Sequence, residues 1–220
     1  MKKTIIFTLI ILSLILTACD NSKDSGKVKS DTGKPIIIES GYGIANGGFA
    51  HCGIIVENKN KEQAFRSYIV RATAYDDNEG VIATEDQYMN VIAPKEKQGV
   101  SVLLDCNNVT PAKIEFKIID GEKISESERV PSSKIKVAID NVTNDGYAIT
   151  KFSGTATNKS KKDMDQVYLC LLLKKSGKIV YSDIEFVNKL NKGATAPFSI
   201  NAMSLPDYDS YEVIACDWSV

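Results

Sequence analysis

The chain has 220 residues, and its 27 basic and 28 acidic residues give a formal net charge of −1 at pH 7. This balance argues against a nucleic-acid-binding surface, which needs a basic excess. The chain has one histidine and no Cys-x-x-Cys spacing, which excludes the common zinc sites built from two or three histidines or from paired cysteines.

The N-terminus has the pattern of an export signal. A basic start at residues 1–3 is followed by an apolar run over residues 4–17 and then by Leu16-Thr17-Ala18-Cys19. A basic region, an apolar region and small residues before a cleavage point are typical of a secretory signal peptide. The apolar run is shorter than the ~20 residues that a transmembrane helix needs, and the alternative is an uncleaved N-terminal anchor.

The last four residues of this segment resemble the lipobox of bacterial lipoproteins, Leu-x-[Ala/Gly]-Cys. The resemblance implies that signal peptide 1–18 is removed and that the Cys19 thiol carries a diacyl, palmitate-type lipid. Two or more acyl chains give stable anchoring. We therefore expect a chain that is held to the cell membrane by Cys19 and faces the extracytoplasmic side, with a net charge of −3 once Lys2 and Lys3 are lost (25 basic and 28 acidic residues).

Residues 19–34 are polar and have almost nothing to bury. Such a segment cannot offset the entropy of becoming ordered, so we expect it to be a flexible tether. The sequence from Pro35 onward holds no second apolar stretch long enough to span a bilayer.

An internal repeat organises the rest of the chain. Five pairs of segments match in the same order: 46–50 with 144–148, 53–61 with 154–161, 70–80 with 167–177, 99–102 with 193–196, and 115–120 with 212–217. The matches predict two homologous domains, residues 35–120 and 133–220, each large enough for one small core. Residues 121–132 are short and polar and are expected to form the linker.

Each repeat has the pattern of an all-β domain. Its short runs of Val, Ile, Tyr and Phe are separated by turn residues roughly every 8–12 positions, which is typical of a β-sandwich. Residues 113–118 alternate between apolar and charged side chains, as in a strand with one buried face. Residues 167–173 are nearly all apolar, as in a central strand that is covered on both faces. We predict two tandem immunoglobulin-like β-sandwich domains.

With the strands assigned, each repeat resembles the FxLYD-type domains of bacterial envelope lipoproteins. The residues that carry the resemblance in the first repeat are Gly53, Val56, Asn58, Ala74-Tyr75-Asp76, Gly80 and Gly99, and in the second Gly154, Thr157, Asn158, Gly177 and Gly193. The second repeat departs from the pattern in having Leu172-Leu173 where the Tyr-Asp pair is expected. The resemblance implies the fold and a non-catalytic role, and it names no ligand.

Four cysteines remain, two in each repeat: Cys52 and Cys106, then Cys170 and Cys216. Four cysteines allow three connectivities. An oxidising compartment favours disulfides, and the even distribution favours pairing within each repeat, with Cys52 and Cys106 spaced so that they can bridge the two sheets of a sandwich. The alternative for Cys170, which lies in an apolar strand, is a buried thiol that acts as a small hydrophobe.

Patterns that could carry chemistry are few. His51 and Cys52 are adjacent, but neighbours on a strand point to opposite faces and should not meet as a catalytic dyad. Residues 76–80 are rich in Asp and Asn but lack the alternating ligands and the distal Glu of a calcium-binding EF-hand. The chain has no Gly-x-Ser-x-Gly elbow or phosphate loop. We therefore predict no catalytic residue, no metal site and no cofactor.

These observations favour a membrane-anchored extracytoplasmic lipoprotein that acts as a non-catalytic binding or scaffolding module of the cell envelope. Its expected partners are the membrane, through Cys19, and an envelope protein or wall component; nucleic acid is not expected. The alternative is a cell-wall-acting hydrolase or another envelope enzyme, against which the single histidine and the lack of a nucleophile motif argue. A solute-binding lipoprotein would need a larger α/β chain with helices that this sequence does not contain.

Overall fold

The computed structural model describes residues 33–45, 48–125, 130–146 and 148–219. The expected signal peptide, Cys19 and nearly all of the expected tether lie outside these residues. No helix in the described part of the chain is long and apolar enough to cross a membrane. The described part of the chain is all-β, which confirms the predicted fold class, and a short 3-10 helix covers Ser132–Lys134.

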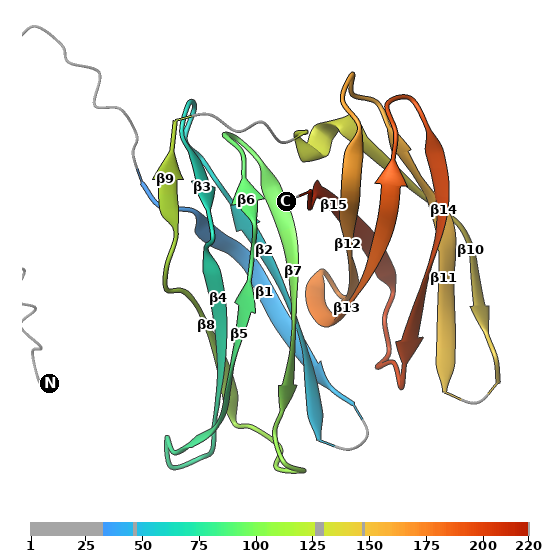
Figure 1. Cartoon of the computed structure of the whole chain (residues 1–220). Coiled ribbons are helices and arrows are strands. Elements are labelled where there is room, and N and C mark those ends of the chain that lie inside the picture. Colours follow the sequence, from blue (N-terminus) through green and yellow to red (C-terminus); the bar gives the residue numbers. More distant parts are fainter. Residues whose placement is uncertain (1–32, 46–47, 126–129, 147, 220) are drawn as a thin grey trace, which may run out of the picture. The chain divides into compact units, whose positions relative to one another are not determined.

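The first half of the chain forms three antiparallel sheets of three strands each (Figure 1). The first sheet has the order β1-β2-β7, the second β5-β4-β8 and the third β6-β3-β9. The strands are β1 (Ile36–Ile44), β2 (Phe49–Glu57), β3 (Ala64–Arg66), β4 (Ile69–Tyr75), β5 (Val81–Tyr88), β6 (Val91–Ile92), β7 (Lys97–Asp105), β8 (Lys113–Ile118) and β9 (Glu122–Ile124).

The second half forms two antiparallel sheets, in the orders β10-β11-β14 and β13-β12-β15. Its strands are β10 (Ile135–Asn144), β11 (Ile149–Asn158), β12 (Met164–Lys175), β13 (Lys178–Leu190), β14 (Thr195–Met203) and β15 (Ser210–Asp217). Strand order is the same in both halves, because β10, β11 and β14 pair as β1, β2 and β7 do, and β13, β12 and β15 pair as β5, β4 and β8 do.

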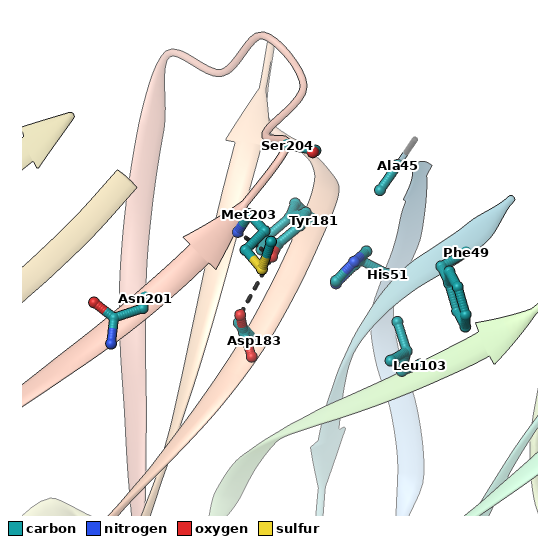
Figure 2. Close-up of a pocket in the computed structure, with 9 residues that line it drawn as sticks. All are labelled: Ala45, Phe49, His51, Leu103, Tyr181, Asp183, Asn201, Met203 and Ser204. Carbon is teal, nitrogen blue, oxygen red and sulfur yellow. Dashed lines mark hydrogen bonds between the residues drawn. The ribbon is translucent and has the colours of Figure 1, made fainter. Parts of the chain in front are cut away.

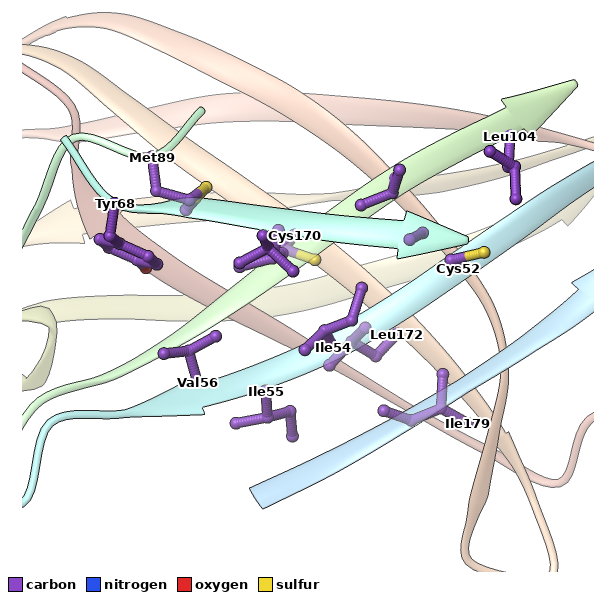
Figure 3. Close-up of a cluster of buried hydrophobic side chains, with 14 of the residues drawn as sticks. Cys52, Ile54, Ile55, Val56, Tyr68, Met89, Leu104, Cys170, Leu172 and Ile179 are labelled. Atoms are coloured by element: carbon purple, nitrogen blue, oxygen red, sulfur yellow. The ribbon is translucent and has the colours of Figure 1, made fainter. Parts of the chain in front are cut away.

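The two halves share a buried interface. Strands β12, β13 and β15 contact β1, β2 and β7 on one side, while β13 and β15 contact β14 and β10 on the other. Along β12, alternate side chains enter two different apolar cores. Tyr168, Cys170 and Leu172 join the core that contains Cys52 and Ile54, and Figure 3 shows Cys170 and Leu172 in this core. Leu169, Leu171 and Leu173 join the core that contains Phe152 and Ile200. The apolar run over residues 167–173 was therefore correctly predicted to be a strand that is covered on both faces.

Glycines let the halves approach closely. A Cβ atom added at Gly41 of β1 would lie 2.1 Å from the carbonyl oxygen of Ile179, and one added at Gly99 of β7 would lie 2.8 Å from the Cβ atom of Cys170. No side chain fits at such a separation, so these two positions of the sheet β1-β2-β7 must be glycine for β12 and β13 to pack against it.

Two buried asparagines hold the same place in the two halves. The backbone N–H of Asn58 donates to the carbonyl oxygen of Glu96, and that of Asn158 donates to the carbonyl oxygen of Ala194, both at 2.9 Å. Their side-chain amides donate to corresponding carbonyls, of Ile92 in the first case and Leu190 in the second. This equivalence agrees with the match found in the sequence.

Other sequence matches were wrong by a few residues. Gly53 and Ser153 each lie five residues before the equivalent asparagine. Gly53 pairs with Ser101, and Ser153 pairs with Ser199. Gly53 therefore corresponds to Ser153 and not to Gly154. By the same count Gly193 takes the place of Lys95, and both have a positive φ. The shared feature there is a left-handed turn, which Gly adopts at the lowest cost.

The place of the Tyr75-Asp76 pair was also misassigned. The carbonyl oxygen of Tyr75 accepts the N–H of Ala112, and that of Lys174 accepts the N–H of Asp209. Both acceptors follow a β-bulge in the strand pairing. The second half therefore has Lys174-Lys175 at this place, where Leu172-Leu173 had been expected.

The expected linker, residues 121–132, is only partly a linker. It contains β9, which pairs with β3 and belongs to the first half. Its described C-terminal part is held from both sides: the buried carboxylate of Glu96 accepts the N–H of Ser132 at 3.1 Å, and that of Asp217 accepts the N–H of Val130 at 2.9 Å.

Candidate binding pocket

A pocket of about 430 Å³ lies where strands from both halves meet (Figure 2). Strand β13 lies at one edge of its sheet and contributes Tyr181 and Asp183. The remaining lining residues come from the β1–β2 connection, β2, β7, β14 and the segment after it, and are Ala45, Phe49, His51, Leu103, Asn201, Met203 and Ser204. This volume is within the range of ~300–1,000 Å³ that is usual for ligand sites.

His51 forms one wall of the pocket and is fixed by two contacts. Its ring stacks on Tyr181, with centroids 4.3 Å apart and planes 19° from parallel. Its Nδ1 lies 3.2 Å from the carbonyl oxygen of Ser182. Because a carbonyl oxygen only accepts, Nδ1 must carry the hydrogen. Burial lowers the pKa of His51, so the ring is neutral at pH 7 and Nε2 is the acceptor.

Asp183 is the charged group of the pocket. One carboxylate oxygen accepts the Tyr181 hydroxyl at 3.2 Å, and the other accepts the N–H of Ile184 at 2.8 Å. Burial raises the pKa of Asp183, while the backbone N–H of Ile184 and the nearby His51 ring act in the opposite direction. None of the ion pairs between described residues involves Asp183.

The remaining walls are apolar and open to solvent. Phe49, Leu103 and Met203 are 37%, 52% and 55% exposed. Isolated exposed apolar residues are ordinary, but apolar side chains gathered around a concave polar site mark a binding surface. The arrangement is therefore that of a site that can hold a ligand with both an apolar and a polar part.

The adjacent His51 and Cys52 point in opposite directions, as the strand geometry predicts. Cys52 is fully buried in the apolar core of the first half. Burial raises the pKa of its thiol to about 12. The two side chains cannot act together, and a neutral buried thiol is a poor nucleophile.

The candidate disulfide pairs lie within sheets. Cys52 is on β2, and Cys106 directly follows the neighbouring strand β7, where its N–H donates to the carbonyl oxygen of Gly48. The expectation that this pair bridges the two sheets of a sandwich is therefore wrong. The buried sulfurs of both residues face backbone carbonyls two residues earlier.

The second pair lies on neighbouring strands in a diagonal register. Cys170 of β12 is opposite Ile214, and Cys216 of β15 is opposite Tyr168. Diagonal neighbours are ~7–8 Å apart at Cα, whereas a disulfide usually needs less than ~7 Å. This diagonal register is less favourable for a disulfide than one in which the two cysteines are directly opposite each other. The disulfides Cys52–Cys106 and Cys170–Cys216 both stay predictions.

The Asp-rich segment 76–80 is the hairpin turn between β4 and β5. The Asp76 carboxylate accepts the backbone N–H groups of Asn78 and Gly80 at 2.8 and 2.7 Å. Its oxygen is used to close the turn. Within the described ranges, no group of three or more His, Cys, Asp or Glu side chains is placed to hold a metal ion.

Sequence reasoning singled out only His51 among the pocket residues. Tyr181 and Asp183 are about 130 positions away in the chain, as the contact between His51 and Ser182 shows (131 positions). No local pattern indicates that they meet, because the meeting depends on how the halves pack. The one available signal was the unusual presence of a single histidine within an otherwise apolar strand.

Comparisons with known proteins place no function on the chain. No protein-family model matches it, and no curated protein matches it. Among solved structures, similar chains include β-glucuronidase 2 of Bacteroides uniformis (14% identity, TM-score 0.25, 76% of this chain and 24% of that one) and the transglutaminase of red sea bream (10%, 0.26, 80% and 30%). A third is the C-terminal globular domain of the oligosaccharyltransferase of Pyrococcus abyssi (9%, 0.21, 83% and 46%). The chain thus spans less than half the length of each, and at these TM-scores the likeness carries no functional argument.

Proposed function

We propose that this chain is a membrane-anchored extracytoplasmic lipoprotein that binds a partner of the cell envelope, an envelope protein or a wall component, without catalysis. The observation that carries the proposal is the pocket, whose lining combines the partly buried carboxylate of Asp183 with the exposed side chains of Phe49, Leu103 and Met203. Partly exposed apolar and aromatic side chains around one polar group are typical of recognition sites.

The location in the proposal rests on the N-terminal sequence. The lipobox resemblance around Cys19 supports a lipid anchor, and the polar segment 19–34 supports a tether. A tether of this kind would let the pocket reach partners near the membrane surface. The FxLYD resemblance supports a non-catalytic envelope module.

The contacts around the pocket favour binding over the alternative, hydrolysis. The serine of β13, Ser182, donates its hydroxyl to the carbonyl oxygen of Cys52 and lies 2.8 Å from the hydroxyl of Ser101. It is fully buried. His51 Nδ1 bonds to a backbone carbonyl, whereas in a Ser-His-Asp triad this atom bonds to a carboxylate.

Site-specific photo-crosslinking in intact cells tests the proposal. A photoreactive residue replaces Leu103 at the pocket rim, and a control replaces Val81, which is 62% exposed at the start of β5. We expect an adduct of defined mass from position 103 only, and we expect Phe49→Ser to suppress it. The proposal is wrong if positions 103 and 81 give the same adducts, or if position 103 gives none.

A further inference from the structure

We propose that the pocket receives the side chain of a lysine or arginine presented by a peptide partner, with Asp183 as the counter-ion of its cationic group. This inference rests on the proposed binding function and names the chemistry that the pocket recognises.

The first argument is charge. Asp183 is partly buried, and its two hydrogen-bond donors, the Tyr181 hydroxyl and the N–H of Ile184, are both neutral. It takes part in none of the ion pairs found among the described residues. A carboxylate that is withdrawn from water without a cation carries an electrostatic cost, and a ligand that brings a cation removes this cost.

The second argument is that apolar side chains and a carboxylate line the same pocket. A small inorganic cation would leave Phe49, Leu103 and Met203 exposed to water, and a purely apolar ligand would cover Asp183 without satisfying it. Lysine and arginine side chains combine an apolar stem with a charged head. Aromatic faces such as Phe49 at the rim also attract cations. The exposed rim extends the contact beyond the pocket, which suits a side chain carried on a peptide more than a free amine.

The third argument is the state of His51. Its ring is neutral at pH 7 because burial lowers its pKa, so it does not compete for Asp183. Once protonated, His51 becomes a cation beside Asp183 and repels an incoming cation. The other titratable groups near Asp183 are Tyr181 and Cys170, whose pKa values are raised by burial, and Glu185 on the same strand. Binding should therefore weaken as pH falls and His51 and Asp183 take up protons.

The single histidine makes the test direct, because the Cε1–H signal of His51 is the only histidine signal of the chain in a ¹H–¹³C spectrum. The full lipid-anchored chain in detergent micelles is titrated at pH 7.5 with acetyl-Gly-Lys-Gly-amide, with its uncharged norleucine analogue, and with n-pentylamine. We expect the lysine peptide to shift the signal with at least ten-fold higher affinity than the norleucine peptide, a difference of about 1.4 kcal/mol. It should also bind more tightly than the free amine.

Two variants assign the effect. Asp183→Asn keeps an acceptor for Tyr181 and removes the charge, and it should abolish the preference for lysine over norleucine. Glu185→Gln removes a charge two residues along β13, outside the pocket lining, and should preserve the preference. Equal affinity for the lysine and norleucine peptides overturns the inference, as does a lysine preference that survives in Asp183→Asn. A free amine that binds as well as the peptide overturns the assignment to a peptide.

The two proposals fail in different ways. If the position-103 adduct forms in cells but the lysine preference is missing, the ligand class is wrong and the binding function stands. If the adduct is also missing, the binding function fails with it.

Discussion

The two buried asparagines offer a quantitative test of how the halves are built. Asn58 and Asn158 are both fully buried; Asn58 directly follows β2, and Asn158 is the last residue of the equivalent strand β11. Replacing each in turn by alanine removes a side chain that joins three backbone segments without changing any charge. If the two residues are structural equivalents, the two substitutions should have similar costs.

The cost follows from the hydrogen bonds. The two amide hydrogens of Asn58 are shared among the carbonyl oxygens of Gln63 at 2.8 Å, Ala93 at 3.1 Å and Ile92 at 3.3 Å. Its oxygen accepts the backbone N–H of Asn60 at 3.1 Å and the Asn60 side-chain amide at 2.8 Å. Each such bond contributes about 1 kcal/mol, and buried partners left unsatisfied increase the loss. Two donated and two accepted bonds therefore give about 4 kcal/mol for Asn58→Ala.

Asn158 gives the same sum. Its amide donates to the carbonyl oxygens of Lys162 at 2.8 Å and Leu190 at 3.0 Å. Its oxygen accepts the N–H of Ser160 at 2.8 Å and the Ser160 hydroxyl at 2.7 Å. We again expect a cost of about 4 kcal/mol. The exposed Asn191 is the matched control, and its replacement by alanine should change stability by less than about 0.5 kcal/mol.

Urea unfolding measures these costs through the single tryptophan. Trp218 stacks on Tyr168 with centroids 5.0 Å apart, so its fluorescence reports on the packing of the second half against the first. A cost below about 1 kcal/mol for either buried asparagine would show that the hydrogen-bond reasoning is wrong. Costs that differ by more than about 2 kcal/mol would refute the structural equivalence of the two residues.

Further predictions address the anchor, the interface, the histidine and the thiols. Cys19→Ala should move the chain from the membrane fraction to the medium or leave the precursor uncut; unchanged partition and cleavage would refute the lipobox assignment. Gly41→Ala places a methyl group against a backbone oxygen and should lower the free energy of unfolding in urea by more than about 3 kcal/mol. Its control is Gly146→Ala, at a position with open space around it and a φ of +82°. This control should cost only the backbone strain, about 1–2 kcal/mol. The pKa of His51 is lowered in the folded chain, so the unfolded chain binds a proton first as pH falls through about 6.5, and the folded state loses stability over this range. His51→Gln should flatten this dependence of stability on pH. An unchanged pH profile in the variant would contradict the prediction. Free-thiol counting on the unfolded, unreduced protein should show fewer than four reactive thiols besides Cys19 if either predicted disulfide forms.

The strands could be predicted from the sequence because burial follows a period of two. Residues 113–118 alternate, and they form β8 with one face toward the core. The run over residues 167–173 lacks alternation, and it forms part of β12, which is buried on both faces. In both cases the pattern of side chains depends on which faces of the strand are covered. The pattern in the sequence therefore indicates whether one face or both faces of the strand are buried.

Register could not be obtained in this way. Gly154 looks like the partner of Gly53 in the sequence, yet the strand pairing puts Ser153 there. Glycines are needed for different reasons at the two places: Gly53 gives room to Leu172 and Ile179 across the interface, whereas Gly154 lies against the carbonyl oxygen of Ala138 in its own sheet. Identical residues with different physical causes make a misleading match. The buried asparagines match correctly because both satisfy the same set of backbone groups.

The pocket was not predictable for a related reason, and that reason bears on its role. It is formed by β2 and β7 of the first half and by β13 and β14 of the second, so neither half contains it alone. The contacts that hold His51 against β13 are the stacking on Tyr181 and the hydrogen bond to Ser182, and both cross the interface. A substitution that loosens the interface, such as Gly41→Ala on β1, should therefore weaken ligand binding even though Gly41 is not part of the pocket lining. A chain that kept its full affinity after the halves had been separated would show that the binding site lies elsewhere. The close glycine-lined packing thus sets both the stability of the fold and the geometry of its binding site.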